Sequence, residues 1–164
     1  MKVIELLKSH QEYFEDFITR STYHSNSIEG STISYAETYA IIFNDNSFKV
    51  SATPREIYDA INHKYAFSQI MDYVENETDL KSGMIINIAK TINKNINEIS
   101  GYRKVSVRIR GAEHIPPAAN EVPGRMMYLL DNYNNFTGGD IFDKIAMFHI
   151  EFESIHPFED GNGR

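Results

Sequence analysis

Residues 156–164 read HPFEDGNGR, and this stretch is the most informative part of the chain. It brings an imidazole, a carboxylate, two glycines and an arginine into one short loop. Glycines let backbone N–H groups approach anionic oxygens closely, and an arginine offers phosphate a planar fork of donors. A neutral histidine is the usual proton acceptor near pH 7. The combination predicts a loop that holds phosphate groups beside a general base.

Composition places the chain among ordinary globular domains. Its 164 residues can bury one core, and 41% apolar and 24% charged residues are normal values for that class. The net charge of −7 argues against a nucleic-acid-binding surface, which needs a basic face. The chain has no cysteine, which excludes disulfides and thiolate metal sites. No apolar run is long enough for a membrane span and no signal-peptide core is present, so we expect a cytoplasmic protein.

Most segments carry helical signals. Two capping boxes, at 34–37 and 53–56, predict helix starts, and the second has Pro54 at the first helical position. The helix that it opens is expected to run to about Glu75. Further apolar residues recur at helical spacing within residues 3–18, 85–96 and 122–133.

The end of the chain combines one strand signal with a final helix. Apolar and polar side chains alternate over residues 105–109, where the apolar members are Val105, Val107 and Ile109. Residues 111–117 would turn this strand back, so we expect a small hairpin. Asp140 is a good N-cap for a last helix that ends at His156.

The stretch 156–164 resembles the signature of the Fic family, H-P-F-x-D/E-G-N-G-R-x-x-R, and matches every position that the pattern specifies there. A simple Gly/Asn turn would explain the bend but not the order of chemical groups. The resemblance implies a mainly α fold, a Fic-like helical bundle with a small β-hairpin flap. In the family the loop leads into a helix with a second arginine three residues beyond Arg164. We therefore expect a fragment: an N-terminal helical region at 1–50 and a Fic core at 51–164, incomplete at its C-terminus.

The resemblance also implies a reaction, the transfer of AMP from ATP to a Ser, Thr or Tyr hydroxyl of a target protein. His156 would take the proton from the hydroxyl, and Asp160 would hold Mg²⁺. Phe158 would anchor the loop in the core. The expected nucleotide-binding residues are Gly161, Asn162, Gly163 and Arg164. The implied partners are thus ATP with Mg²⁺ and a protein with an exposed hydroxyl, without a membrane or a nucleic acid, and self-association is left open.

A second motif, SNSIEG at residues 25–30, indicates regulation. Alone it reads as a surface helix turn that ends at a C-terminal glycine. It is also similar to the Fic inhibitory pattern S/T-x-x-x-E-G/N, so the resemblance implies inhibitory roles for Ser25, Glu29 and Gly30. In that class the glutamate pairs with the second arginine of the loop and leaves ATP in an unproductive pose. Here we expect Glu29 to pair with Arg164 or to face water.

The family's flap pairs with the target backbone by strand addition, which implies that Val105, Val107 and Ile109 dock the target. Three alternatives remain open. The protein could transfer another phosphate-containing group or remove AMP. It could be an inactive fragment or a non-catalytic interaction module. It could also be a metal hydrolase, because His149, Glu153 and His156 share one side of the last helix.

Overall fold

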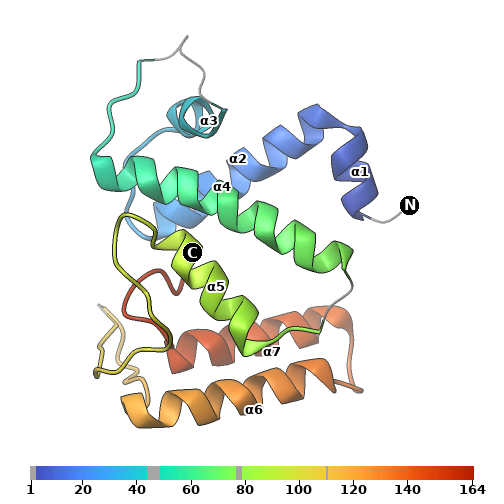
Figure 1. Ribbon diagram of the computed structural model, residues 1–164, viewed down its shortest axis with the longest axis vertical. Coiled ribbons are helices and arrows are strands. Elements are labelled where there is room, and N and C mark those ends of the chain that lie inside the picture. Colours follow the sequence, from blue (N-terminus) through green and yellow to red (C-terminus); the bar gives the residue numbers. More distant parts are fainter. Residues whose placement is uncertain (1–2, 44–48, 77–78, 110) are drawn as a thin grey trace. The chain divides into compact units, whose positions relative to one another are not determined.

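The part of the chain that the structure describes is mainly helical. The computed structural model describes residues 3–43, 49–76, 79–109 and 111–164, and it contains seven α-helices, one short 3-10 helix and no strand within these ranges. The elements are α1 (Val3–Ser9), α2 (Gln11–Ile28), α3 (Tyr35–Phe43), α4 (Pro54–Glu75), α5 (Ser82–Ile92), η1 (Ala119–Glu121), α6 (Val122–Asn134) and α7 (Ile141–Ile155), as drawn in Figure 1. None of these helices is both long enough and apolar enough to cross a membrane.

The chain divides into two compact units that do not follow a single cut of the sequence. The first unit takes the described residues of 1–78 together with Thr91–Glu98 and Gly163–Arg164. The second unit takes Asp79–Lys90 and Ile99–Asn162. The sequence predicts a different division, into an N-terminal helical region at 1–50 and a Fic core at 51–164. That division stays a prediction.

Local capping signals mark the starts of α3 and α4 in the first unit. Both predicted capping boxes are confirmed: Ser34 and Glu37 exchange hydrogen bonds before α3, and Thr53 and Glu56 do so before α4. The helix α4 starts at Pro54 and ends at Glu75, as expected. At the other end of α2, Gly30 follows the cap with a positive φ of 93°.

The packing of α2 against α4 inside the first unit is partly polar. The helix α2 buries Thr19, Thr22 and Asn26 beside Ile18, at spacings that place them on one face. Thr22 Oγ1 lies 2.9 Å from Nδ1 of His63 on α4. Burial lowers the pKa of His63 to about 4, because the charged imidazolium is disfavoured away from water. The histidine is therefore neutral in the folded protein near pH 7.

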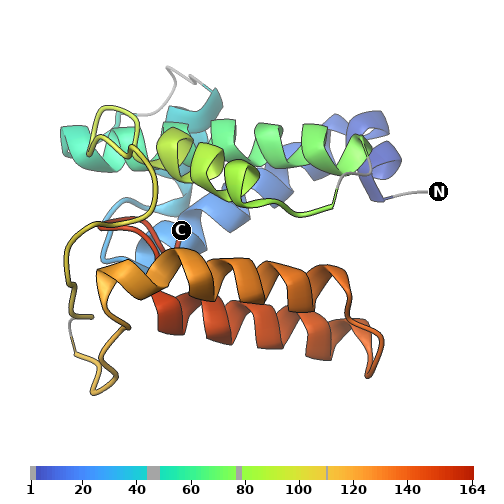
Figure 2. The same cartoon turned by 60° about the horizontal axis from the view of Figure 1, so that its bottom comes forward.

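The second unit has an apolar core between its helices. The helices α6 and α7 run side by side in both views (Figures 1 and 2) and pack against each other. A capping box at Asp140 and Asp143 starts α7, which confirms the predicted N-cap. The buried side chains of this core are Ile85, Ala89, Val122, Met126, Leu129, Leu130, Ile155 and Phe158.

The expected hairpin flap is not seen, so that part of the fold prediction is wrong for the described residues. Residues 105–109 and 111–117 form no strand there, and Arg110 lies outside the described residues. Val105 is 52% exposed, so its side chain does not pack as alternation predicted. Alternation of apolar and polar side chains shows that a segment can pair with another strand. An isolated two-stranded ribbon, however, has too few cross-strand contacts to be stable in water.

Candidate active site

His156 stands at the end of α7 in a left-handed conformation, with φ 50° and ψ 63°. Its N–H still donates to Phe152 O at 2.9 Å, so the residue completes the last helical turn. A left-handed residue commonly ends a helix, and Pro157 cannot continue it. The side chain of His156 is half-buried. The sequence thus delivers the imidazole at a fixed point where the helix stops.

Arg103 holds the end of α7 in place. It is 3% exposed, and its Nε donates to His156 O at 2.8 Å. Other guanidinium nitrogens donate to the carbonyl oxygens of Ile155, Val105 and Pro117 at 3.3, 2.9 and 2.6 Å. A cation is favoured at a helix C-terminus because the last carbonyls are unpaired and carry partial negative charge. Burial lowers the pKa of Arg103.

Apolar burial anchors the first part of the loop. Phe158 is 2% exposed and belongs to the core of the second unit, which confirms that it anchors the loop. Its ring lies 5.7 Å from that of Tyr102, whose hydroxyl is 2.8 Å from Ser82 Oγ. Arg103 N also donates to Pro157 O at 2.9 Å. The peptide after His156 therefore has little freedom to move.

Asn162 closes the loop on itself. Its Oδ1 accepts from Phe158 N at 2.9 Å, and its Nδ2 donates to Phe158 O at 3.0 Å. Gly161, at the tightest point, has φ 77°, which a residue with a Cβ rarely adopts. These bonds occupy the Asn162 amide, so any contact of this residue with a ligand falls mainly to its backbone.

The last two residues of the loop belong to the first unit, where acidic side chains surround them. A Cβ at Gly163 would collide with Oε1 of Glu29 and lie 3.5 Å from its Cδ, so a larger residue at this position would require the glutamate side chain to move. Arg164 Nη1 forms an ion pair with Asp59 Oδ1, and the arginine side chain is 2% exposed. Burial lowers the pKa of Arg164, the positive charge of Arg55 acts in the same direction, and Glu29 opposes both.

The family comparison agrees with this geometry. The model of the Fic/DOC family matches residues 79–164, which is more than half of the chain. The chain belongs to the Fic/DOC family. The matched part of this Fic chain includes Arg103, α7 and the whole loop from His156 to Arg164.

Known relatives place the chain among Fic proteins named as adenylyltransferases. It is 36% identical over 92 residues to a "Probable protein adenylyltransferase" of Aquifex aeolicus (strain VF5), covering 56% of this chain and 29% of the relative. It is 27% identical over 150 residues to the "Protein adenylyltransferase Fic" of Nematostella vectensis, covering 87% of this chain and 34% of the relative. The chain thus spans about a third of the length of the curated relatives that it matches.

Solved structures share the fold. A Fic family protein from Desulfovibrio desulfuricans G20 superposes with a TM-score of 0.75 at 29% identity, covering 90% of this chain and 44% of that one. A Fic domain protein from Bacteroides thetaiotaomicron gives a TM-score of 0.82 at 22% identity, covering 98% and 68%. The mainly helical Fic-like fold is therefore confirmed.

The structure groups the predicted site residues of the Fic chain in two sets. His156 to Asn162 lie in the second unit, whereas Glu29, Gly163 and Arg164 lie together in the first. Ser25 lies in the last turn of α2, Glu29 is its C-cap and Gly30 follows, and the inhibitory role of these residues stays a prediction. Arg164 forms an ion pair with Asp59, and Glu29 is an exposed residue, in agreement with the second alternative expected for it, that it faces water.

Sequence reasoning missed two residues at the Fic loop, Asp59 and the side chain of Arg103. Asp59 carried a weak signal, because Arg55 lies four residues earlier on the same helix face. Arg103 lies just before the segment expected to form the flap, but three of its four carbonyl partners, those of Pro117, Ile155 and His156, are 14 to 53 residues away in the chain. Hydrogen bonds to residues so far apart in the chain cannot be predicted from a local sequence pattern.

The residues of the Fic loop fit a metal ion that arrives with its nucleotide. Asp160 offers one carboxylate, and Mg²⁺ in phosphate-transfer sites is held by one or two carboxylates together with substrate phosphates. No cluster of three His, Cys, Asp or Glu residues that could hold a metal occurs in the described ranges. His149, Glu153 and His156 therefore do not form the metal-binding cluster on which the metal-hydrolase alternative depends, and His149 is exposed.

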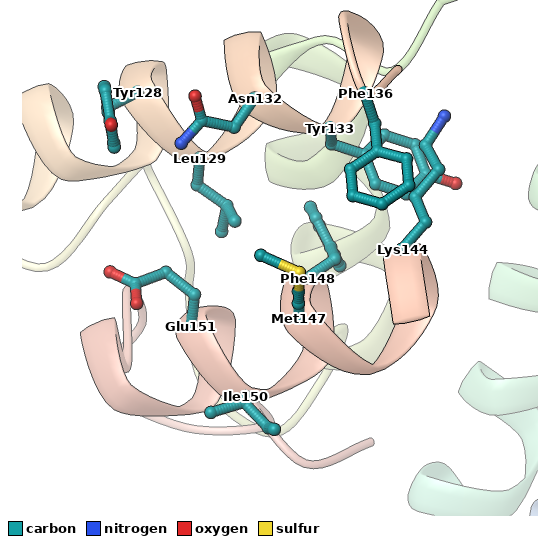
Figure 3. A pocket seen from close by; sticks show the side chains of 10 residues that line it. All are labelled: Tyr128, Leu129, Asn132, Tyr133, Phe136, Lys144, Met147, Phe148, Ile150 and Glu151. Atoms are coloured by element: carbon teal, nitrogen blue, oxygen red, sulfur yellow. The ribbon is translucent and has the colours of Figure 1, made fainter. Parts of the chain in front are cut away.

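A groove of about 320 Å³ lies between α6 and α7, away from the predicted site residues. Figure 3 shows the side chains that line it, among them Leu129 from α6 and Met147, Phe148 and Ile150 from α7. The outer face of α7 is also apolar, with Phe142 76% and Ile150 64% exposed. Exposed apolar residues of this kind are typical of surfaces that pack against other protein.

Proposed function

We propose that this chain carries the catalytic loop of a protein adenylyltransferase that moves AMP from ATP to a Ser, Thr or Tyr hydroxyl of a target protein. The observation that carries the proposal is the placement of His156. His156 has a half-buried side chain, its carbonyl at the end of α7 is bound by Arg103, and it is followed by a loop that Asn162 closes, in which Gly161 has a positive φ. This is the arrangement that a base beside an anion-binding turn requires.

The proposed chemistry assigns one task to each loop residue. His156 accepts the proton of the target hydroxyl, whose oxygen bonds to the α-phosphorus of ATP as the bond to the bridging oxygen breaks and pyrophosphate leaves. The backbone N–H groups of Gly161, Asn162 and Gly163 would donate to phosphate oxygens, and Arg164 would add positive charge. Asp160 would hold Mg²⁺, which supplies charge neutralisation for the leaving pyrophosphate.

Regulation by Glu29 is part of the same proposal. Its carboxylate lies against Gly163 within the first unit, so it brings negative charge to the end of the loop where phosphate would bind. Like charges this close repel, and a phosphate chain would have to shift or displace the glutamate. We infer that Glu29 restrains the reaction and that Ser25 and Gly30 shape the end of α2 that presents it.

Target docking is assigned to residues 105–109. This segment has an extended sequence pattern without a strand partner in the described residues, and Arg103 fixes its start through Val105 O. A segment of this kind forms a ladder when another backbone supplies the second strand. Val105, Val107 and Ile109 would then contact alternate residues of the target.

The experiment compares labelled nucleotides in the full-length protein. ATP labelled at the α-phosphate should label protein, whereas ATP labelled at the γ-phosphate should not. Transfer of the γ label would contradict the proposal, and so would labelling only by CDP-choline or GTP. Failure of the Glu29→Gly variant to bind ATP with Mg²⁺ while it remains folded would instead support a non-catalytic module.

A further inference from the structure

Asp59 joins two arginines in the first unit, one through each carboxylate oxygen. Its Oδ1 pairs with Arg164 Nη1, and its Oδ2 lies 3.6 Å from Arg55 Nε. The side chain of Asp59 is 12% exposed and that of Arg164 is 2% exposed, so water screens the contact with Arg164 poorly. Arg55 is 55% exposed and contributes less. The Arg164 contact is therefore the stronger of the two.

The helix that carries Asp59 is fixed at this point. Its first turn is held by the capping box of Thr53 and Glu56, and Glu56 Oε1 also accepts from Thr32 N at 2.7 Å. One turn later, Asn62 Nδ2 donates to Ile92 O and Lys94 O at 3.0 and 2.7 Å. A carboxylate on such a helix is a rigid point of attachment, whereas Arg164 lies in a loop.

Without the Asp59 charge, Arg164 would lose the ion pair at its Nη1. Its guanidinium would remain buried near the positive charge of Arg55, an arrangement that costs free energy because a buried charge needs a partner. The side chain would turn toward Glu29 or toward solvent. Because Arg164 directly follows Gly163, this movement would shift the peptide that the loop offers to phosphate.

We propose that Asp59 is the positioning residue of the catalytic loop: it holds Arg164 and, through it, the Gly163 peptide. The inference rests on the proposed function and extends it by naming what orients the charged end of the phosphate-binding turn. Asp59 acts through Arg164 and does not itself touch the nucleotide. Its loss should therefore weaken binding of phosphate groups and leave recognition of the nucleoside unchanged.

The first test measures binding of ATP and of adenosine to the full-length protein in a Glu29→Gly background, so that inhibition does not mask the result. Asp59→Asn should weaken ATP binding about tenfold or more, because small misplacements of binding groups have effects of that size. Adenosine affinity should not change. Asp72→Asn is the matched control, since Asp72 is an exposed residue of the same helix, and it should change neither affinity. Equal losses for both ligands, or no loss of ATP affinity, would overturn the proposal.

The second test is a double-mutant cycle that does not depend on nucleotide. Asp59→Asn and Arg164→Gln, singly and combined, are compared in urea unfolding of the full-length protein. If the two residues stabilise the protein through their ion pair, the double variant should have a free energy of unfolding no lower than that of the less stable single variant. Additive losses would overturn the proposal. Asp59→Glu keeps the negative charge and should retain most of the ATP affinity. This variant keeps the proposal testable if Asp59→Asn fails to fold.

These outcomes separate the two proposals. If the Glu29→Gly protein binds ATP but transfers no label, the proposed function fails, while selective loss of ATP binding in Asp59→Asn still supports the role of Asp59. If label is transferred and Asp59→Asn behaves like its control, the role of Asp59 fails and the proposed function stands. If the parent binds neither ligand, the unfolding cycle alone decides about Asp59.

Discussion

The two compact units bury different kinds of side chain. In the first unit, buried polar residues from α2, α3, α4 and the segment after α5 share the interior with aliphatic ones; they are Thr19, Thr22, Asn26, Thr38, Asn62, His63 and Asn93. The core of the second unit is aliphatic and aromatic, with Arg103 as the buried polar residue identified there. The second unit anchors His156, the proposed base, by packing and backbone hydrogen bonds, whereas charged side chains surround the end of the loop in the first unit.

The two units also differ in the partners of their buried arginines, Arg103 and Arg164. The guanidinium of Arg103 donates to carbonyl oxygens, which are neutral and belong to the backbone, so it serves as a structural clamp. Arg164 is balanced by the carboxylates of Asp59 and Glu29. Anions can compete with carboxylates for an arginine, but they cannot replace carbonyls that end a helix. Only the second kind of arginine suits a site that binds and releases phosphate.

The largest effect is expected from removing the base while leaving the Arg103 clamp intact. His156→Ala should lower AMP transfer by about two to four orders of magnitude, the usual contribution of a general base. Folding should be retained, because Arg103 bonds the His156 carbonyl rather than its ring. Labelling by α-labelled ATP measures the loss. His149→Ala, at an exposed histidine of the same helix, is the control, and equal labelling by both variants would contradict the assignment.

Breaking the clamp itself should affect stability. Arg103→Gln leaves carbonyl oxygens at the end of α7 without their donor and should destabilise the protein by about 3 kcal/mol, since buried unpaired polar groups are costly. Urea unfolding measures the change. Arg108→Gln removes the same charge at an exposed position and should be nearly neutral. A similarly small effect at Arg103 would show that the clamp is dispensable.

The polar interior of the first unit should make stability depend on pH. His63 has its pKa lowered from 6.5 to about 4, so the unfolded state binds the proton more readily between these values. Stability should therefore be complete above pH 6.5 and fall as the pH drops toward 4, with a loss of about 2 kcal/mol at pH 5. The measurement is urea unfolding at pH 7 and pH 5. His63→Gln should remove the difference, whereas His24→Gln, at an exposed position, should preserve it.

The smallest effect is expected from removing the charge of Glu29, which lies against the end of the loop in the first unit. Glu29→Gly should raise self-labelling of the full-length protein by about tenfold, a typical size for a coupling between an inhibitory group and a ligand. Densitometry of label from ATP measures the change. Glu98→Gly, at an exposed residue of the same unit, should leave labelling as it was. If self-labelling of the Glu29→Gly protein is unchanged, Glu29 does not restrain the reaction.

The elements that could be predicted depend on neighbours in the chain. The starts of α3, α4 and α7 follow from capping boxes, in which donor and acceptor lie within one turn. The burial of Phe158 was expected from its place in the motif. The hairpin at 105–117 could not be decided in the same way, because a strand exists only with a partner, and alternation does not supply one.

The sequence by itself determined the chemical order of the loop, the helix that ends at His156 and the membership of the Fic/DOC family, because these depend on residue identity and local bonding. Only the tertiary structure decided that Arg103 clamps the end of α7, that Arg164 pairs with Asp59 and that Glu29 lies against Gly163. Each of these contacts joins residues far apart in the chain. Which buried charge meets which partner depends on how helices pack, and no local pattern encodes that choice.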